Sequence, residues 1–476
     1  MDRCEDLQRV AGRLAASAAA ALVLAGAAAA RADAIDDYLR AELTARSIPG
    51  LALAVARDGV VERVSVYGLA HVELGAPVTE SSIFAIASLD KQLTAAGVLA
   101  AAERGRLGLD DPLAKWVDTP FAGVTLRHLL SHTAGLPDQV AATFEGRSLA
   151  SYTTAQLLAT VAGLTPVAPP GHRFLYSDAG LFLAQLATER AVGEPWWDFM
   201  RRELFAPAGM VSVRSMAPDA ILPGRVSAYT LDAAGALERD RRLDFDFGPL
   251  YTDLGMTVAD FARWLAALDS GRPLAAASVA AMTTPVLLAD GRAGGELFQW
   301  SRYGLGVGLD DFLGEPVVLH SGHSGVGFAR FPARRLAVVV FTNLEHPAGS
   351  DPVGLALGVA GLLEPALALV PKVPAPSPAA AEMARLEAEY RRLLAGAPDL
   401  ERYAPALRVT AWEGAGGLAG RSPRLGELAR FDLIEERQLD GERALLCRAS
   451  HARGRLYLRF SLDAAGRISR LVWWRV

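Results

Sequence analysis

Strand-forming stretches lie near both ends of one long unit, and mostly helical patterns fill the interval between them. Residues 51–57 and 60–67 are apolar runs joined by Asp58-Gly59, a strong signal for a two-residue hairpin turn. Strand signals return only at residues 315–320 and 336–343. We therefore expect an α/β fold whose antiparallel sheet is built from both termini of the unit, with a helical subdomain inserted between them. The active site should lie where the two parts meet.

Helical spacing of apolar residues defines the rest of this unit. A helix is expected to begin near residue 88 and to end at Gly105. Further helices are expected at residues 36–46, 125–131, 154–161, 181–192, 196–205, 258–269 and 352–363. The unit predicted in this way spans residues 35–368.

The first 34 residues fit a secretory signal peptide. Three arginines precede an apolar run over residues 14–30, and alanines at positions 30, 32 and 34 provide small residues for cleavage. An uncleaved N-terminal anchor is the alternative. Cleavage would leave Cys447 as the only cysteine, so an internal disulfide is not expected. We expect a periplasmic or secreted protein with no membrane span after cleavage.

A Pro/Ala-rich stretch at residues 369–379 is predicted to be an extended linker. Beyond it, residues 380–476 are predicted to form a small α+β accessory domain. Its helix is expected at residues 380–396, and its β-hairpins at residues 444–448, 455–462 and 468–476. Alternation in these strands favours packing on one face, with the tryptophans near the end in the core. No catalytic constellation is found here, and the sequence does not identify a partner for this domain.

Composition excludes some functions. The chain has 476 residues, 51% of them hydrophobic, so a large buried core is available. Its formal net charge is −5, so the chain lacks the basic footprint of a nucleic-acid-binding protein.

Ser88 and Lys91 form the first candidate for chemistry. Residues three apart share a helix face, so the hydroxyl and the amine can lie within hydrogen-bond reach. A hydroxyl is a poor nucleophile while it keeps its proton, and a neutral amine beside it can accept that proton. The chain has only three lysines, which draws attention to one placed beside a serine at a helix start. The alternative is a helix-capping serine beside a solvated lysine.

Tyr176 precedes a predicted helix, and a phenol near cationic groups can shuttle a proton. A lone tyrosine at this position is otherwise a core residue. His320 and His323 lie in a strand that ends in small residues, His-Ser-Gly-His-Ser-Gly. Exposed backbone N–H groups in such a strand can form half of an oxyanion hole, with the N–H of Ser88 as the other half. His-x-x-His also occurs in metal sites, but the sequence shows no carboxylate or cysteine at ligand spacing. We therefore expect neither a metal nor a cofactor.

Residues 125–137 hold a further polar motif, Leu129-Leu-Ser-His-Thr-Ala-Gly-Leu136. His132 and Thr133 are expected to tie a loop to a helix end, with Gly135 and Pro137 as turn residues. No catalytic role is assigned to them.

Together these motifs resemble the serine β-lactamase-related superfamily over about residues 35–365. The matching stretches are Ser88-Leu-Asp-Lys91, the Leu129–Leu136 motif, Tyr176-Ser-Asp178 and His320-Ser-Gly322, in family order. That group includes class C β-lactamases, penicillin-binding DD-peptidases, D-aminopeptidases and family VIII carboxylesterases. The motifs are specific for fold and catalytic apparatus, but not for substrate.

The resemblance implies a role for each matching residue. Ser88 would be the acylated nucleophile, Lys91 its proton acceptor, and Tyr176 the group that passes a proton to the leaving group and activates water. His320 and Gly322 would lie at the substrate strand. In that register the N–H of His323 falls at the oxyanion position. The register that starts at His323 is the alternative.

Two residues depart from the family pattern. Asp178 stands where the family has asparagine, so a charge beside Lys91 would favour the protonated amine and oppose its role as a base. His320 stands where many members have lysine, and a neutral imidazole binds a substrate carboxylate less firmly than a permanent cation does.

The sequence therefore predicts an exported serine hydrolase that acts through an acyl-enzyme on small esters or peptide-like amides. A β-lactamase or DD-peptidase is the alternative within the enzyme class, so the expected partner is a small-molecule ester, amide or β-lactam substrate. From another class, the chain could be a non-catalytic cell-wall ligand sensor or scaffold, and Asp178 is the feature that fits this reading best.

Overall fold

The computed structural model describes residues 33–137, 153–217, 220–232, 234–240, 254–295, 300–346, 349–370, 380–408, 418–419 and 424–476. Most of the expected signal peptide (1–34) and of the expected linker (369–379) lies outside the described residues. Within the described ranges, no helix is both long and apolar enough to cross a membrane. Cys447 is described as a buried free cysteine.

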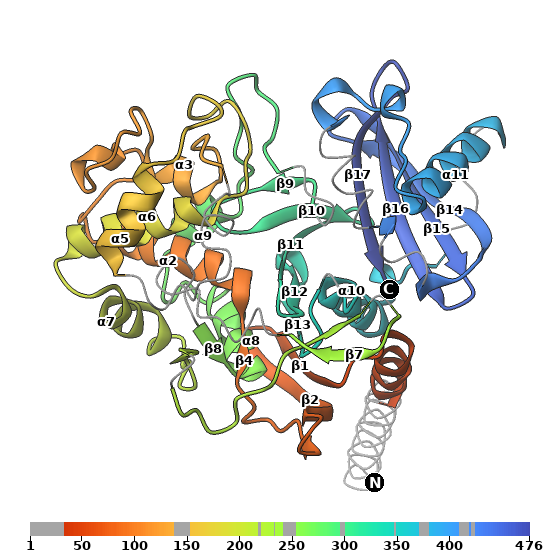
Figure 1. Ribbon diagram of the computed structural model, residues 1–476, viewed down its shortest axis with the longest axis horizontal. Coiled ribbons are helices and arrows are strands. Elements are labelled where there is room, and N and C mark those ends of the chain that lie inside the picture. The colour runs from red at the N-terminus through yellow and green to blue at the C-terminus, as the bar shows by residue number, and fades with distance from the viewer. Residues whose placement is uncertain are drawn as a thin grey trace, which may run out of the picture.

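An eight-stranded sheet joins the two ends of the main unit (Figure 1). At its centre β1 (Gly50–Arg57) pairs antiparallel with β13 (Leu336–Thr342), and Leu53 lies opposite Val340. The strand order is β3 (Ala76–Pro77), β2 (Val60–His71), β1, β13, β12 (Val326–Phe331), β11 (Glu315–Gly322), β10 (Gly308–Phe312) and β9 (Arg302–Tyr303). The expected mixed α/β class with antiparallel sheets is confirmed.

Both faces of this sheet are covered, which explains why β1 is apolar throughout. Residues 52, 54 and 56 face a core that includes α2, α6 and α8, and residues 51, 53 and 55 face a second core that includes α10. Successive side chains of a strand point to opposite faces, so a strand buried on both sides needs apolar residues at every position. α8 (Val258–Ala267) packs on β1 and β13, and α10 (Pro352–Leu363) packs on β12 and β13.

Helices occupy much of the chain between β2 and β9. They are α2 (Asp90–Glu103), α3 (Leu126–Leu130), α5 (Thr154–Ala162), α6 (Asp178–Val192), α7 (Trp196–Met200), α8 and α9 (Ala276–Met282). Residues 33–46 are also helical. A π-helical turn, η4 (Arg201–Phe205), continues α7. The helix that follows the nucleophile motif begins at Asp90 rather than at residue 88, because Ser88 lies in the preceding 3-10 turn η1 (Ala87–Leu89).

The C-terminal residues form a separate four-stranded sheet, drawn in blue in Figure 1. Its order is β14 (Leu428–Leu439), β15 (Glu442–His451), β16 (Gly454–Leu462) and β17 (Ile468–Arg475). One face packs on α11 (Ala380–Leu394), and the other joins the second core of the main unit. The expectation of packing on one face is therefore wrong: Trp473 and Trp474 are both buried, on opposite faces.

Short strands complete the fold. β4 (Phe84–Ala85), β8 (Leu254–Met256) and β5 (Arg214–Ser215) form a three-stranded sheet directly before η1, and β6 (Tyr229–Leu231) pairs with β7 (Leu237–Arg239). The three-stranded sheet joins segments far apart in the chain. The small sheet thus fixes the backbone that leads into Ser88.

Candidate active site

Ser88, in η1, lies beside Lys91, in the first turn of α2. The Nζ of Lys91 donates a hydrogen bond to the Oγ of Ser88 at 3.1 Å. Ser88 is half-buried, whereas Lys91 is only 1% exposed. Directly before them Ala87 has φ +43°, a value that an L residue adopts only under constraint from its surroundings. The hydroxyl and the amine are therefore presented from a rigid backbone.

Tyr176 lies on the other side of Lys91, just before α6. The Nζ of Lys91 is 5.0 Å from the centre of the Tyr176 ring. Burial raises the pKa of Tyr176 well above the ordinary value, although the charge of Lys91 and hydrogen bonds with Ser88 and Lys91 act to lower it. Tyr176 is thus a neutral phenol near pH 7, able to donate or relay a proton rather than to start as a phenolate.

Asp178 forms an ion pair with Lys91. Its Oδ1 lies 2.6 Å from Nζ, and Asp90 Oδ1 lies 3.9 Å from the same atom. Burial alone would lower the pKa of Lys91. However, Asp178, Tyr176 and Asp90 raise it, and the outcome is a pKa well above the ordinary value. In the resting protein Lys91 is therefore an ammonium held between a carboxylate and the Ser88 hydroxyl.

His320 lies in β11 and is fully buried. Its Nδ1 lies 2.8 Å from the carbonyl oxygen of Ser321 and so donates to it, which leaves Nε2 to accept from the hydroxyl of Tyr303 at 3.1 Å. Burial and the nearby Lys91 lower the pKa of His320 to about 3. His320 is therefore neutral at pH 7, and both of its ring nitrogens are already hydrogen-bonded within the protein.

Gly322 allows β11 to lie against the nucleophile turn. A Cβ at this position would lie 2.7 Å from the carbonyl oxygen of Ile86 and 3.2 Å from the Cβ of Ala87. Ser324, just beyond, donates a hydrogen bond from Oγ to the carbonyl oxygen of Ala85 at 2.7 Å. The structure thus brings Ser88, Lys91, Tyr176 and β11 together, as the sequence predicted.

The Beta-lactamase family profile matches residues 11–363, most of the chain. The chain belongs to this family. Its members include serine hydrolases.

Three curated proteins are similar to the chain. It is 34% identical to penicillin-binding protein 4* of Bacillus subtilis (strain 168) over 31% of this chain and 34% of that protein. It is 30% identical to penicillin-binding protein 4 of Amycolatopsis lactamdurans, over 64% and 83% of the two chains. Esterase EstB of Burkholderia gladioli is 31% identical over 38% of this chain and 50% of the esterase. The match thus spans about a third of the Bacillus protein and half of the Burkholderia esterase.

A solved structure extends the likeness in fold to the C-terminal region. The octameric penicillin-binding protein homologue from Pyrococcus abyssi aligns with a TM-score of 0.63 and 20% identity, over 91% of this chain and 96% of that one. An identity this low shows the fold alone.

His323 differs from His320 in its surroundings. It lies after β11 with a ring 40% exposed, and its Nε2 is 3.2 Å from Glu345. A ring nitrogen of His323 and one carboxylate oxygen each from Asp240 and Glu345 lie within 4.8 Å of one another. The carboxylate neighbours that sequence spacing did not reveal therefore surround His323, because the fold brings residues 240 and 345 to it.

Three further residues adjoin the site. His132, expected to be a loop tie, accepts a hydrogen bond at Nδ1 from the N–H of Ser177 (3.1 Å), and its carbonyl accepts one from the N–H of Leu175 (2.7 Å). Its ring also lies 4.3 Å from that of Tyr176, so it holds the tyrosine from both flanks. Trp300 and Tyr303 form an aromatic wall against His320. The ring centres of Trp300 and His320 are 4.6 Å apart, and the hydroxyl of Tyr303 is hydrogen-bonded to His320. The Leu129–Leu136 motif predicted that His132 ties a loop to a helix end, and its hydrogen bonds with Ser177 and Leu175 confirm it. No local pattern marks Trp300 or Tyr303.

Proposed function

We propose that this member of the Beta-lactamase family is an exported serine hydrolase that acts through an acyl-enzyme on small esters or peptide-like amides. The observation that carries the proposal is the 3.1 Å hydrogen bond from Lys91 Nζ to Ser88 Oγ, with Tyr176 beside it. A non-catalytic binding protein does not need a nucleophile, an amine and a phenol in contact.

We assign each residue a role that these contacts support. Lys91, once it is neutral, takes the proton of Ser88 Oγ as that oxygen forms a bond to the substrate carbonyl carbon. The N–H groups of Ser88 and His323 are assigned to the carbonyl oxygen as its negative charge develops. Lys91 then returns the proton through Tyr176 to the leaving alcohol or amine as its bond to carbon breaks. In the second step a water oxygen bonds to the acyl carbon and gives its proton to the same pair, the bond from that carbon to Ser88 Oγ breaks, and the pair returns the proton to Oγ.

The charge at β11 bears on substrate class. A neutral His320 whose two nitrogens are engaged within the protein offers no cation to a substrate carboxylate. This favours neutral esters and amides over β-lactams and peptides that end in a carboxylate. The similarity to an esterase is in keeping with this preference.

A β-lactamase or DD-peptidase is the second candidate, and a different residue favours it. A cavity of about 310 Å³ is lined by Ala85, three residues before Ser88, by Ser324, in the turn after β11, and by Arg225. Arg225 is half-buried and donates to the carbonyl oxygens of Met216 and Ala217. Its permanent charge could receive a substrate carboxylate that enters this cavity.

One panel separates these functions. Purified wild type, Ser88→Ala and Arg225→Gln are assayed on short-chain p-nitrophenyl esters, D-amino acid amides and nitrocefin. The proposal expects ester or amide turnover well above nitrocefin turnover, abolished by Ser88→Ala and little changed by Arg225→Gln. Dominant nitrocefin turnover that falls with Arg225→Gln would favour the second candidate. No turnover, together with calorimetric binding of a cell-wall fragment, would favour the sensor.

The proposed organisation comprises a signal peptide at 1–34, the catalytic domain at 35–368 with its helical part inserted in the sheet, a linker at 369–379 and the accessory domain at 380–476. N-terminal sequencing of protein recovered from the periplasm or medium tests the first boundary. A mature N-terminus at residue 33 or 35 is expected; a full-length product in the membrane fraction would point to the uncleaved anchor.

A further inference from the structure

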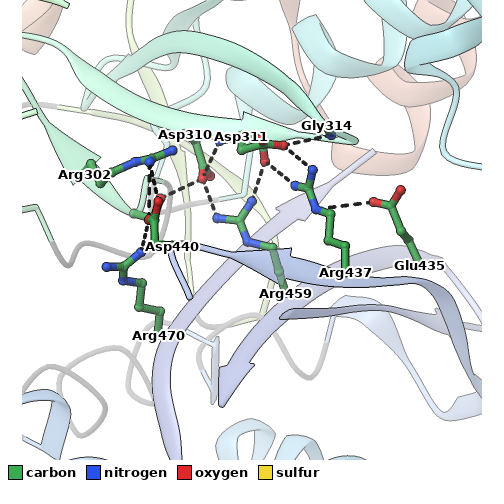
Figure 2. A network of polar contacts seen from close by, with 10 residues as sticks. Arg302, Asp310, Asp311, Gly314, Glu435, Arg437, Asp440, Arg459 and Arg470 are labelled. Atoms are coloured by element: carbon green, nitrogen blue, oxygen red, sulfur yellow. Dashed lines mark hydrogen bonds and ion pairs between the residues drawn. The ribbon is translucent and has the colours of Figure 1, made fainter. Parts of the chain in front are cut away.

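A cluster of charges joins the C-terminal sheet to the edge of the main sheet, as Figure 2 shows. Arg459 of β16 pairs with Asp310 of β10 and donates to the carbonyl oxygen of Asp311 at 2.5 Å. Arg459 and Asp310 are 3% and 0% exposed at their side chains, so this pair is fully buried. Arg437 of β14 adds an ion pair to Asp311 Oδ1 at 2.5 Å.

A second contact reaches β9 itself. Asp440 stands in the turn between β14 and β15, and its carboxylate lies 3.0 Å from Arg302 and 2.6 Å from Arg470. Arg302 and Arg470 lie on different sheets, so Asp440 bridges the two domains (Figure 2). The three residues line a cavity of about 550 Å³, which leaves this contact partly open to solvent.

Four consecutive residues connect these contacts to the active site. Ser301 donates to Asp310 Oδ1 at 2.8 Å, and Arg302 pairs with Asp440. Their neighbours on either side, Trp300 and Tyr303, are the two residues packed on His320. Residues 300–303 therefore contact both the C-terminal domain and the wall of the site.

The arrangement of β16 supports the same reading. Alternating residues of this strand point to α11, while Tyr457 packs in the core shared with the main unit and Arg459 reaches Asp310. On β17, Trp474 lies edge-on to Phe312 of β10, with ring centres 5.8 Å apart. The face of the C-terminal sheet that carries these residues is thus fitted to β10, the strand next to β9.

We infer that the C-terminal domain is a positioning element for the active site. Its contacts from Arg459 to Asp310 and from Asp440 to Arg302 hold residues 300–303 so that Trp300 and Tyr303 stay packed on His320. Asp440 and Arg459 are positioning residues here, since they touch neither the nucleophile nor its amine. The inference goes beyond the proposed hydrolase activity and assigns the accessory domain a function within this chain.

Asp440→Asn is the most informative variant. Asp440 is 33% exposed at its side chain, so removing its charge leaves no buried charge unpaired, unlike a change at Asp310. Asp432→Asn is the matched control, because Asp432 pairs with Arg448 at 3.0 Å inside the C-terminal sheet. Asp440→Glu tests rescue by the conservative change.

The first readout is the ring of His320, followed by NMR of protein labelled in its histidine side chains and assigned with His320→Asn. Besides Tyr303, the titratable groups facing this ring are Lys91 and Tyr176, with His132 also close enough to affect its charge. In the wild type, burial and the nearby Lys91 hold the pKa of His320 low, at about 3. A loosened wall would hydrate it, and in Asp440→Asn we expect its pKa to rise by about one unit, a tenfold change in proton affinity.

The second readout is kinetic. Displaced residues 300–303 would misalign the bound substrate, so kcat/KM for the best ester should fall by roughly tenfold in Asp440→Asn, short of the hundredfold loss of a 1 Å misplacement. Asp440→Glu should recover most of both changes. A His320 titration and kinetics in Asp440→Asn that match Asp432→Asn would overturn the inference. The NMR readout needs no turnover, so it decides the inference even if the chain hydrolyses none of the substrates above.

Discussion

Lys91 and Asp178 form a buried ion pair, with 2.6 Å between Nζ and Oδ1, in a site where Lys91 also donates to the nucleophile. The side chains are 1% and 9% exposed. The family resemblance led us to expect asparagine at this position, and the carboxylate of Asp178 instead places a charge directly beside Lys91. Because Asp178 raises the pKa of Lys91, the activity of the site should depend on whether Lys91 is protonated.

The pH dependence of Asp178→Asn tests this link. Burial lowers the pKa of Lys91, but Asp178 is the largest of the groups that raise it above the ordinary value. Only the neutral amine can act as base, so wild-type kcat/KM should rise steadily with pH through neutrality and beyond. Without Asp178 the pKa of Lys91 falls, and the rise should begin at lower pH, with higher activity at pH 7. An activity loss with an unmoved pH profile would instead make Asp178 a required proton acceptor.

Stability should reveal the same pair. Lys91→Met leaves the Asp178 carboxylate buried without its main partner, and breaking a buried ion pair costs about 3–5 kcal/mol. The double variant Lys91→Met/Asp178→Asn removes both charges and should recover much of that loss in the free energy of unfolding. Urea titrations of the two single variants and the double variant measure this coupling. Additive losses would show that the residues are not paired in solution.

Gly322→Ala should impair the site without unfolding the protein. The new Cβ would meet the carbonyl oxygen of Ile86 at 2.7 Å, so β11 or the turn with Ser88 must move apart. We expect kcat/KM to fall by roughly a hundredfold, the cost of a displacement of about 1 Å. Gly180→Ala in α6 is the control, because its Cβ meets Leu129 at an ordinary 3.5 Å. Equal activity in the two variants would contradict the close approach.

His132 should act through Tyr176. Its φ of +56° lies in the left-handed region, which asparagine tolerates better than most residues. An asparagine oxygen can also accept the hydrogen bond from Ser177 that Nδ1 accepts now. His132→Ala should therefore lower kcat more than His132→Asn, with little change in KM. Similar kcat losses in both, matched by equal losses of thermal stability, would indicate a purely structural role.

Local signals predicted much of the fold. The Asp58-Gly59 turn marked the hairpin of β1 and β2, and α10 was expected with the bounds it has. The sequence did not reveal β12 or β14, in which glycine, arginine and acidic residues interrupt the apolar pattern. It also missed that both faces of the C-terminal sheet are covered, because the docking face includes Arg459, whose partner Asp310 lies far away in the chain.

The candidate site could be predicted in part for the same reason. Ser88 and Lys91 are three residues apart, so helix geometry alone brings them together. Asp178 was flagged as a charge beside Lys91, and the ion pair is present. The wall formed by Trp300 and Tyr303 depends on the pairing of β9 with β10 and on contacts from the C-terminal domain, which have no local signature.

The central claim is that Ser88 is the residue that becomes acylated. Wild type and Ser88→Ala are incubated with a fluorophosphonate probe, and intact-mass spectrometry with peptide mapping locates the adduct. One adduct on the peptide that carries Ser88 in the wild type, and none in Ser88→Ala, is the predicted result. An adduct that persists in Ser88→Ala at another residue, with ester turnover intact, would contradict the account.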